Sequence, residues 1–252
     1  MKRLIAGEFS KLATTRLWCW LLIASMGISA LYAGLNIGFA DNTVTYSLAT
    51  PQGQQTLFSV AASAAAPLAA VLGAIGLTGE FRHRTATATF LASPNRGRVV
   101  AAKFVTYGAV GAGYGVVSTA VVAALATTWL PAKGIEISLT GNGLPATMIG
   151  GVAAVAIYGL IGVGLGALLR DQVATVVGML IYLYVVENII TGIPALSGWT
   201  IYLPGQAANA LTGMALTTRD FLPAWHGGLL LAGYGIMFAV AGNYLTMRRD
   251  IA

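Results

Sequence analysis

The sequence GEFRHRTATATFLASPNRGRVVAAK, residues 79–103, is a charged stretch that separates two long apolar runs. We name residues 80–103 the basic island, because they hold five of the fourteen basic residues of a chain in which only 9% of residues are charged. These five are Arg82, Arg84, Arg96, Arg98 and Lys103. Charge concentrated in one loop of an otherwise apolar chain indicates a face that meets a soluble partner.

The apolar runs around the island predict an all-α integral membrane protein with a single transmembrane domain, residues 1–252. The chain is 57% hydrophobic with a mean hydropathy of +0.77, and a soluble domain of this size needs more charge to cover its surface. A helix needs roughly 20 apolar residues to cross a hydrocarbon core about 30 Å thick. Six stretches satisfy this requirement: Leu17–Ala40, Leu57–Gly79, Phe104–Leu130, Ala146–Leu169, Val173–Pro194 and Gly227–Met247.

The distribution of the basic residues predicts the orientation of the chain, which has a net charge of +6. Twelve basic residues lie before the first span or after the second, fourth and sixth spans, and only Lys133 and Arg219 fall on the other side. The positive-inside rule then places both termini and the basic island in the cytoplasm, in a multi-pass protein of the plasma (inner) membrane. Because these charges mark topology, we expect a lipid bilayer as a partner and no nucleic acid.

Two segments outside the spans have a pattern of their own. Residues 1–16 carry Ile5, Phe9 and Leu12 at helical spacing with basic side chains on other faces, which predicts an amphipathic helix on the cytoplasmic membrane surface. The alternative is an ordinary basic flank that anchors the first span. Residues 195–226 are half apolar and broken by glycine and proline into pieces too short to cross. They predict an external re-entrant segment of short helices between the fifth and sixth spans.

The sequence contains no motif of a known catalytic site. It has no G-x-x-x-x-G-K-[ST] loop for nucleotide, no G-x-S-x-G elbow and no H-E-x-x-H pair. Its two histidines, His83 and His226, lie on opposite sides of the membrane in the predicted topology, and Cys19 is the only cysteine. We therefore expect a protein that is not an enzyme and that holds no metal or cofactor in this chain.

One acidic residue lies inside a predicted span. Tyr184, Glu187, Asn188 and Thr191 follow each other at i, i+3, i+4 and i+7 and predict one polar stripe on the fifth span. A carboxyl group in that position faces protein or water rather than lipid. Two interpretations stay open: a residue of a translocation path that attracts cationic substrate or takes up a proton, and a structural link bonded to a neighbouring hydroxyl or to the external segment.

The basic island has an internal order. Residues 79–82 end the second span, residues 85–93 are compatible with a short helix, and residues 94–98 turn the chain. A short helix held between two spans transmits a push from a soluble domain into the membrane. The alternative is a basic loop that sets the topology and touches anionic lipid, and charge alone does not separate the two.

The island resembles the loop after the second helix in the membrane subunits of type-2 ABC exporters. That loop carries a glutamate and an arginine, then Gly-Thr, then a Pro-Arg turn and a lysine. These places are filled here by Glu80, Arg82, Thr85, Pro94, Arg96 or Arg98, and Lys103. Arg84 departs from the pattern, because the family most often has glycine there. The basic N-terminus, the six spans, the glutamate late in the fifth span and Tyr202-Leu203-Pro204 extend the resemblance over nearly the whole chain.

The resemblance implies a permease subunit that moves a hydrophobic or amphipathic compound outward, such as a drug, an antibiotic or a lipid-like molecule. Two such subunits, identical or related, pair in the membrane, and each rests on a separate cytoplasmic ATPase that binds ATP and Mg. Residues 80–98 then form the coupling loop that docks on this ATPase, and closure of the ATPase rearranges a path lined by the second and fifth spans. The implied docking residues are Glu80, Phe81, Arg82, Thr85, Pro94, Arg96 and Arg98.

Two other functions remain open on the sequence. A secondary transporter would use Glu187 as a proton site, and internal repeats would support it, although the two halves of the chain show none that is convincing. The third candidate is a membrane protein that transports nothing, such as an immunity or scaffolding factor.

Overall fold

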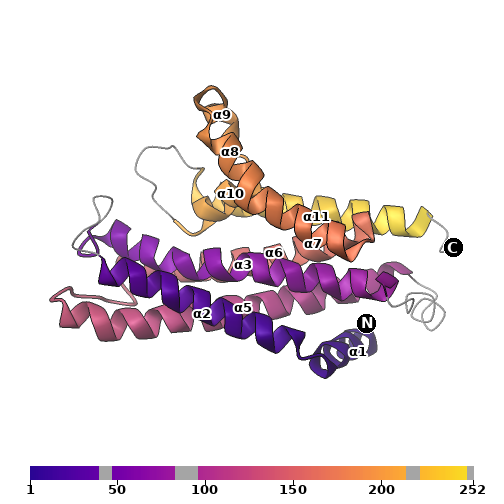
Figure 1. The fold of residues 1–252 in the computed structure, drawn as a ribbon, viewed down its shortest axis with the longest axis horizontal. Coiled ribbons are helices and arrows are strands. Elements are labelled where there is room, and N and C mark those ends of the chain that lie inside the picture. Colours follow the sequence, from indigo (N-terminus) through magenta and orange to yellow (C-terminus); the bar gives the residue numbers. More distant parts are fainter. Residues whose placement is uncertain (40–46, 83–95, 214–221, 249–252) are drawn as a thin grey trace.

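The structure is a computed structural model that describes residues 1–39, 47–82, 96–213 and 222–248. Within these ranges the regular elements are helices that pack side by side along one axis (Figure 1). The long helices are α1 (Lys2–Thr14), α2 (Leu17–Gly38), α3 (Pro51–Arg82), α5 (Arg96–Ala132), α6 (Leu144–Leu169), α7 (Gln172–Ile181) and α11 (Ala224–Arg248). The short ones are η1 (Tyr182–Val186), α8 (Glu187–Gly192), η2 (Pro194–Leu196), α9 (Ser197–Thr200) and α10 (Pro204–Leu211).

The predicted number of spans is confirmed, because the described residues contain six helical stretches that are long and apolar enough to cross a membrane, one of them the continuous run of α7, η1 and α8. Two of them are longer than the sequence predicted. Helix α3 has 32 residues and α5 has 37, which at 1.5 Å per residue makes them about 48 and 56 Å long, against a hydrocarbon core of about 30 Å. Both helices therefore continue past the apolar segment that defined the predicted span.

The extra length places part of the predicted coupling loop, residues 80–98, within helices α3 and α5. Residues 80–82 belong to the last turn of α3, and Arg96 begins α5. The connection between the two helices is therefore shorter than residues 80–98. Helix α3 continues because no residue before Arg82 breaks it and because Glu80 pairs with lysines inside the bundle. Residues 83–95, which include the predicted short helix at 85–93, lie outside the described residues.

The centre of the bundle is the pair α3 and α6, which pack closely against each other and against α5. Glycine allows this contact, because a methyl group at Gly162 would overlap the carbonyl of Ala70 and one at Gly73 would overlap the carbonyl of Gly159. Gly111 and Gly115 on α5 meet α6 in the same way, at Val155 and Val152. The small-residue spacings of the sequence thus serve packing within this chain.

The fifth span departs from the bundle. It begins as α7 beside α3, passes through the π-helical turn η1 and leaves the bundle as α8 and α9, which project away from the other helices in Figure 1. Helix α10 returns to the bundle and packs on α11 and α6. The segment predicted as re-entrant therefore contains short helices in its described part.

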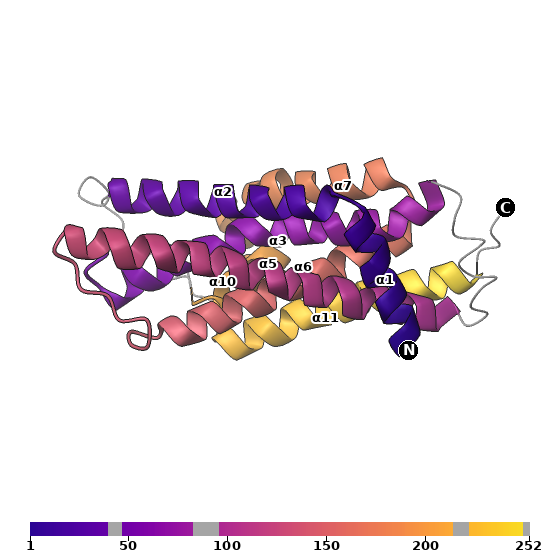
Figure 2. The same cartoon turned by 90° about the horizontal axis from the view of Figure 1, so that it is seen from below.

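Helix α1 crosses the bundle at the end where the last described residues of α11 also lie (Figure 2). It packs on α5 and buries Glu8 and Leu12. Of the predicted apolar stripe, Leu12 is 8% exposed and packs against the bundle, whereas Phe9 is 40% exposed. The face that meets the bundle is centred on Glu8, a charged residue that the apolar pattern had not marked.

Candidate functional site

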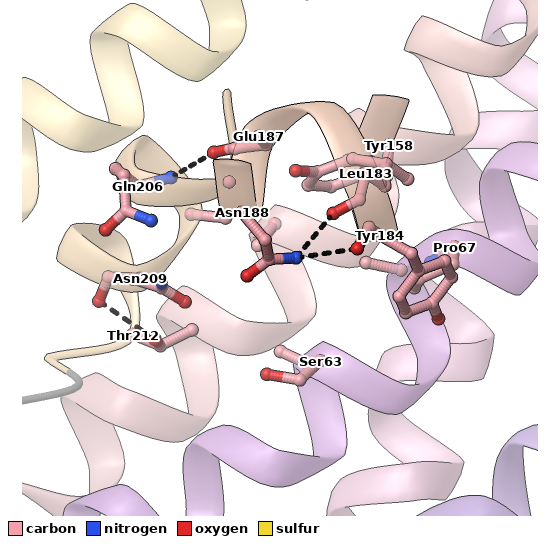
Figure 3. A pocket seen from close by; sticks show the side chains of 15 residues that line it. Ser63, Pro67, Tyr158, Leu183, Tyr184, Glu187, Asn188, Gln206, Asn209 and Thr212 are labelled. Carbon is pink, nitrogen blue, oxygen red and sulfur yellow. Dashed lines mark hydrogen bonds between the residues drawn. The ribbon is translucent and has the colours of Figure 1, made fainter. Parts of the chain in front are cut away.

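A polar pocket of about 190 Å³ lies where the fifth span separates from the bundle. Its walls come from α3, α6, the η1–α8 part of the fifth span and α10. Figure 3 shows Glu187, Asn188, Gln206 and Asn209 around it, with Ser63 on the facing helix α3.

Glu187 is the charged residue among those that line this pocket, and it is 4% exposed. Its Oε1 atom accepts a hydrogen bond from the backbone N–H of Gln206 at 3.1 Å. Gln206 lies in the first turn of α10, where backbone N–H groups lack helical partners and the helix dipole favours a negative charge. The other oxygen, Oε2, is buried and has no hydrogen-bond partner among the described residues.

Gly205 makes this contact possible. A methyl group at position 205 would lie 2.5 Å from Oε1 of Glu187, well inside van der Waals distance. Pro204 precedes it at the first helical position, where the missing N–H of proline costs nothing. The Pro-Gly pair therefore starts α10 and opens its N-terminus to a carboxylate from another helix.

The π-helical turn η1 places Glu187 on the inner side of the fifth span. A π turn adds one residue to the helical turn and rotates the residues that follow it, and such turns often mark functional sites. The side chain of Asn188 reaches back to this turn. Its Nδ2 donates to the carbonyl of Tyr184 at 3.0 Å and to that of Leu183, five residues back, at 3.4 Å. The rotation explains why Glu187 is buried while Tyr184, three residues earlier, is 60% exposed.

The predicted polar stripe is therefore found in part as one surface. Tyr184, Glu187 and Asn188 all line the pocket. Thr191 is not among the lining residues, and its hydroxyl donates to the carbonyl of Asn188 at 3.1 Å. The bond from Gln206 also provides the link to residues 195–226 that the structural interpretation of Glu187 required, although it reaches only one of the two carboxylate oxygens.

The sequence had not marked Ser63, Gln206 and Asn209 as pocket residues. Gln206 and Asn209 are three apart on α10 and so share one face of it, a pattern that is too short to stand out. Ser63 lies four residues before Pro67, which lacks the N–H that would bond to the carbonyl of Ser63. A proline inside an apolar span was the available signal for this place on α3.

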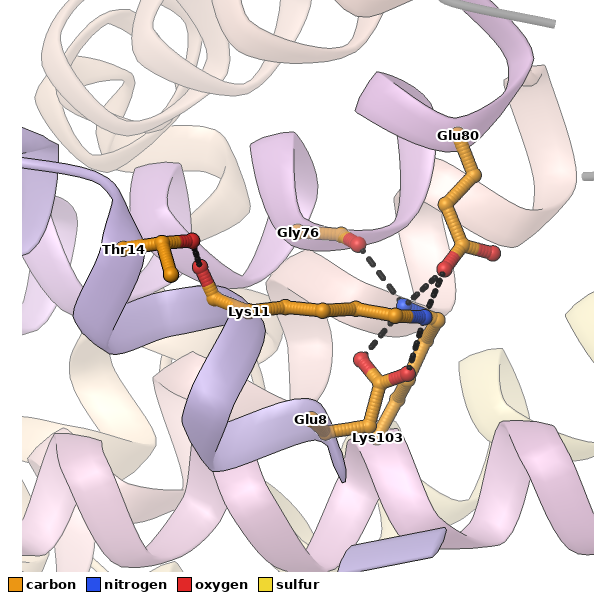
Figure 4. Close-up of polar contacts among 6 residues, drawn as sticks. All are labelled: Glu8, Lys11, Thr14, Gly76, Glu80 and Lys103. Atoms are coloured by element: carbon orange, nitrogen blue, oxygen red, sulfur yellow. Dashed lines mark hydrogen bonds and ion pairs between the residues drawn. The ribbon is translucent and has the colours of Figure 1, made fainter. Parts of the chain in front are cut away.

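A second cluster of charges lies near α1, at the end of α3 that holds Glu80. We name Glu8, Lys11, Glu80 and Lys103 the inner charge cluster (Figure 4). Lys103 Nζ donates to Glu8 Oε2 at 2.7 Å and to the carbonyl of Gly76 at 3.0 Å, and it lies 2.9 Å from Glu80 Oε1. These three contacts use all three N–H bonds of an ammonium group whose side chain is 1% exposed.

Lys11 completes the cluster from α1. Its Nζ donates to Glu8 Oε1 at 2.7 Å and to Glu80 Oε1 at 2.8 Å. Partial burial disfavours the charged lysine, but the bonds to the two carboxylates outweigh this and raise the pKa of Lys11 above its usual 10.5. Two ammonium groups face two carboxylates, so the cluster is neutral and joins α1, α3 and α5.

The remaining described residues of the predicted coupling set lie around the end of α3. The ring of Phe81 lies 5.4 Å from the guanidinium carbon of Arg170 at the end of α6. Arg82 is exposed and its Nη1 donates to Oε1 of Gln172 at 3.3 Å, at the start of α7. Arg98 is exposed in the first turn of α5.

The other predicted coupling residues are less fully described. Arg96 begins α5. Thr85 and Pro94 lie outside the described residues. The structure thus brings Glu80, Phe81 and Arg82 together at one helix end, with each of them in contact with a different neighbouring element.

The chain was compared with known proteins. No model of a protein family matches the sequence, and no curated protein matches it. Among the described residues, no group of three or more histidine, cysteine, aspartate or glutamate side chains is placed to hold a metal ion.

Proposed function

We propose that this protein is the permease subunit of an ATP-driven exporter of the type-2 ABC class, which moves a hydrophobic or amphipathic compound outward. In this proposal ATP and Mg bind to a separate cytoplasmic ATPase, and a second permease subunit, identical or related, completes the path. The chain lies in the plasma membrane with α1, the island and both termini in the cytoplasm. Helix α1 lies on the cytoplasmic membrane surface, and the segment at 195–226 dips into the outer leaflet.

The observation that carries this proposal is the set of contacts at the end of α3. Glu80 is joined to α1 and α5, Phe81 meets the end of α6, and Arg82 bonds to the start of α7. A force applied to the connection between α3 and α5 therefore acts on these helices together. A loop that only sets topology does not need such attachments.

Helix α3 also connects the proposed coupling residues with the pocket. It runs from the inner charge cluster at Glu80 to the pocket at Ser63 and Pro67. Because Pro67 removes one hydrogen bond from the helix, α3 bends at lower cost there than elsewhere along its length. Movement of its cytoplasmic end then changes the wall of the pocket, as transport requires.

A secondary transporter that takes up a proton at Glu187 is the second candidate. The buried Oε2 atom of Glu187 favours it, because a proton on that oxygen would remove the unpaired charge. This candidate needs no ATPase and gives no role to the contacts of Phe81 and Arg82.

Co-purification tests the proposal. The tagged chain is extracted from its native membrane in a mild detergent, and the proteins bound to it are identified by mass spectrometry. We expect an ATP-binding subunit in a fixed ratio to the permease, and we expect Arg82→Ala to reduce the amount bound. Recovery of the intact chain without an ATP-binding subunit, together with transport that persists without ATP, would show that the proposal is wrong.

A further inference from the structure

The carboxylate of Glu187 in this pocket is only partly hydrogen-bonded. The carboxylate has one oxygen bonded to Gln206 and one oxygen, Oε2, that is buried without a partner among the described residues. No lysine, arginine or histidine is among the residues that line the pocket. A buried charge or acceptor without a partner is costly, and in native proteins such an atom calls for a ligand or a proton.

The neighbouring polar groups also present acceptors. Asn188 directs its Nδ2 donor to two carbonyls of its own helix, which leaves its Oδ1 free to face the pocket, as Figure 3 shows. A positively charged ligand with N–H donors fits these two acceptors, Glu187 Oε2 and Asn188 Oδ1.

The rest of the wall is apolar and the space is small. Ala62, Ala66, Pro67, Leu183 and Ala208 line the pocket beside the polar groups. Its volume of about 190 Å³ is below the range of about 300–1,000 Å³ of sites that enclose a drug-sized molecule. The pocket therefore suits the head of an amphipathic molecule, with an apolar tail that continues between the helices.

We propose that this pocket binds the protonated amine of a cationic amphiphile, with Glu187 Oε2 as its counter-ion and Asn188 Oδ1 as a second acceptor. As a cargo site it rests on the proposed transport function. Its ability to bind the amine does not depend on that function, because the contacts that form the pocket lie within one chain and need neither ATP nor the ATPase.

Equilibrium binding with a matched pair of probes tests this proposal. Dansylcadaverine carries a primary ammonium on an aromatic tail, and its N-acetylated form is neutral with nearly the same shape. The purified full-length chain, in a neutral detergent, is titrated with each probe, and the saturable change in dansyl fluorescence is measured. We expect the wild-type chain to prefer the charged probe by at least about tenfold, the usual effect of a hydrogen bond to a charged group.

Glu187→Gln is the decisive variant, because the amide keeps an oxygen for the N–H of Gln206 and keeps the size of the side chain. It should bind both probes equally, at the weak affinity of the neutral one. Glu136→Gln removes the same charge from an exposed position outside the pocket and should leave the preference unchanged. The thermal midpoint of each variant shows whether it is folded.

Two results would overturn the proposal. One is equal binding of the two probes to the wild-type chain, which needs no variant and indicates that Glu187 holds at most a proton. The other is a preference for the charged probe that survives in Glu187→Gln. Neither result bears on whether an ATPase co-purifies with the chain, so failure of the site and failure of the permease proposal are separable.

Discussion

The two clusters of charge in this bundle differ in how completely they are paired. In the inner charge cluster, Glu8 and Glu80 face Lys11 and Lys103, and Lys103 uses every donor it has. In the pocket, Glu187 is held by backbone N–H groups at the start of α10, its Oε2 atom has no hydrogen-bond partner among the described residues, and no basic residue is among those that line the pocket. Both sets lie in an apolar protein where an uncompensated charge is expensive.

This difference separates two uses of a buried carboxylate. Pairing between three helices holds α1, α3 and α5 in one arrangement, and the ammonium of Lys103 has no N–H left for a ligand. An unpaired oxygen contributes nothing to holding the helices together and leaves a place for a charged partner. We expect substitutions in the inner charge cluster to lower stability first, and substitutions at the pocket to lower binding first.

The largest expected effect comes from Lys103→Met. Removing one ammonium leaves two carboxylates to share Lys11, and breaking a buried ion pair from one side costs about 3–5 kcal/mol. The unfolding midpoint of the purified chain in detergent should fall steeply. Lys2→Met, on the exposed part of α1, is the matched control and should have little effect. The double variant Lys103→Met with Glu80→Gln restores charge balance and should recover part of the loss, whereas no recovery would contradict the pairing account.

At the pocket, Gly205→Ala should reduce binding of the charged dansyl probe by at least about tenfold, with a smaller effect on stability. The added methyl group would lie 2.5 Å from the Glu187 carboxylate and displace it. Gly198→Ala is the control, because a methyl group there meets no atom within 4 Å. Both variants are titrated as described for the wild type. Unchanged binding in Gly205→Ala would mean that the carboxylate position does not matter to the ligand.

Two residues at the end of α3, the exposed Arg82 and the buried Glu80, have effects between these extremes. Arg82→Ala removes the bond to Gln172 but no buried charge, so we expect normal yield and ATP hydrolysis with several-fold less transport per ATP hydrolysed. Glu80→Ala should lower yield as well, because it leaves two lysines to share Glu8. The ratio of transport to hydrolysis is measured in vesicles that hold the chain and its ATPase. An unchanged ratio of transport to hydrolysis in Arg82→Ala would mean that Arg82 only helps to set the topology.

The smallest effect concerns Lys11, which is half exposed. Its pKa is raised in the folded protein, so its stabilising contribution is fully present below the ordinary value of 10.5 and is lost as the pH rises through the higher folded value. The difference in unfolding midpoint between the wild type and Lys11→Met should therefore be constant from pH 7 to about pH 10. Above that pH the difference should shrink. A difference that disappears near neutral pH would argue against the ion pairs of Lys11.

The fold could be predicted from the sequence because the length of an apolar run is a direct physical signal. Six runs long enough to cross a bilayer gave six helices. The helix ends could not be predicted in the same way. Glu80 was assigned to the predicted coupling loop and Lys103 to the start of the third span, whereas in the structure Lys103 is buried and pairs with both Glu80 and Glu8. That pairing joins residues up to 95 positions apart, which no local pattern reveals.

The pocket was predictable only in part for a similar reason. Glu187 stood out as an acid within an apolar span, and a regular helix placed Asn188 and Tyr184 beside it. The π turn η1 changed which face each residue takes. The partner of Glu187 is a backbone N–H of Gln206, and a backbone group carries no mark in the sequence beyond the Pro-Gly pair that starts α10.

Transport into inverted membrane vesicles tests the central claim most directly. Vesicles that contain the chain and its co-purified ATPase are given dansylcadaverine with ATP or with a non-hydrolysable ATP analogue, and the accumulated probe is measured. The account predicts accumulation that requires ATP hydrolysis, is lost in Glu187→Gln and is retained in Glu136→Gln. Accumulation that proceeds without ATP and follows an imposed proton gradient would contradict it and would favour the secondary transporter.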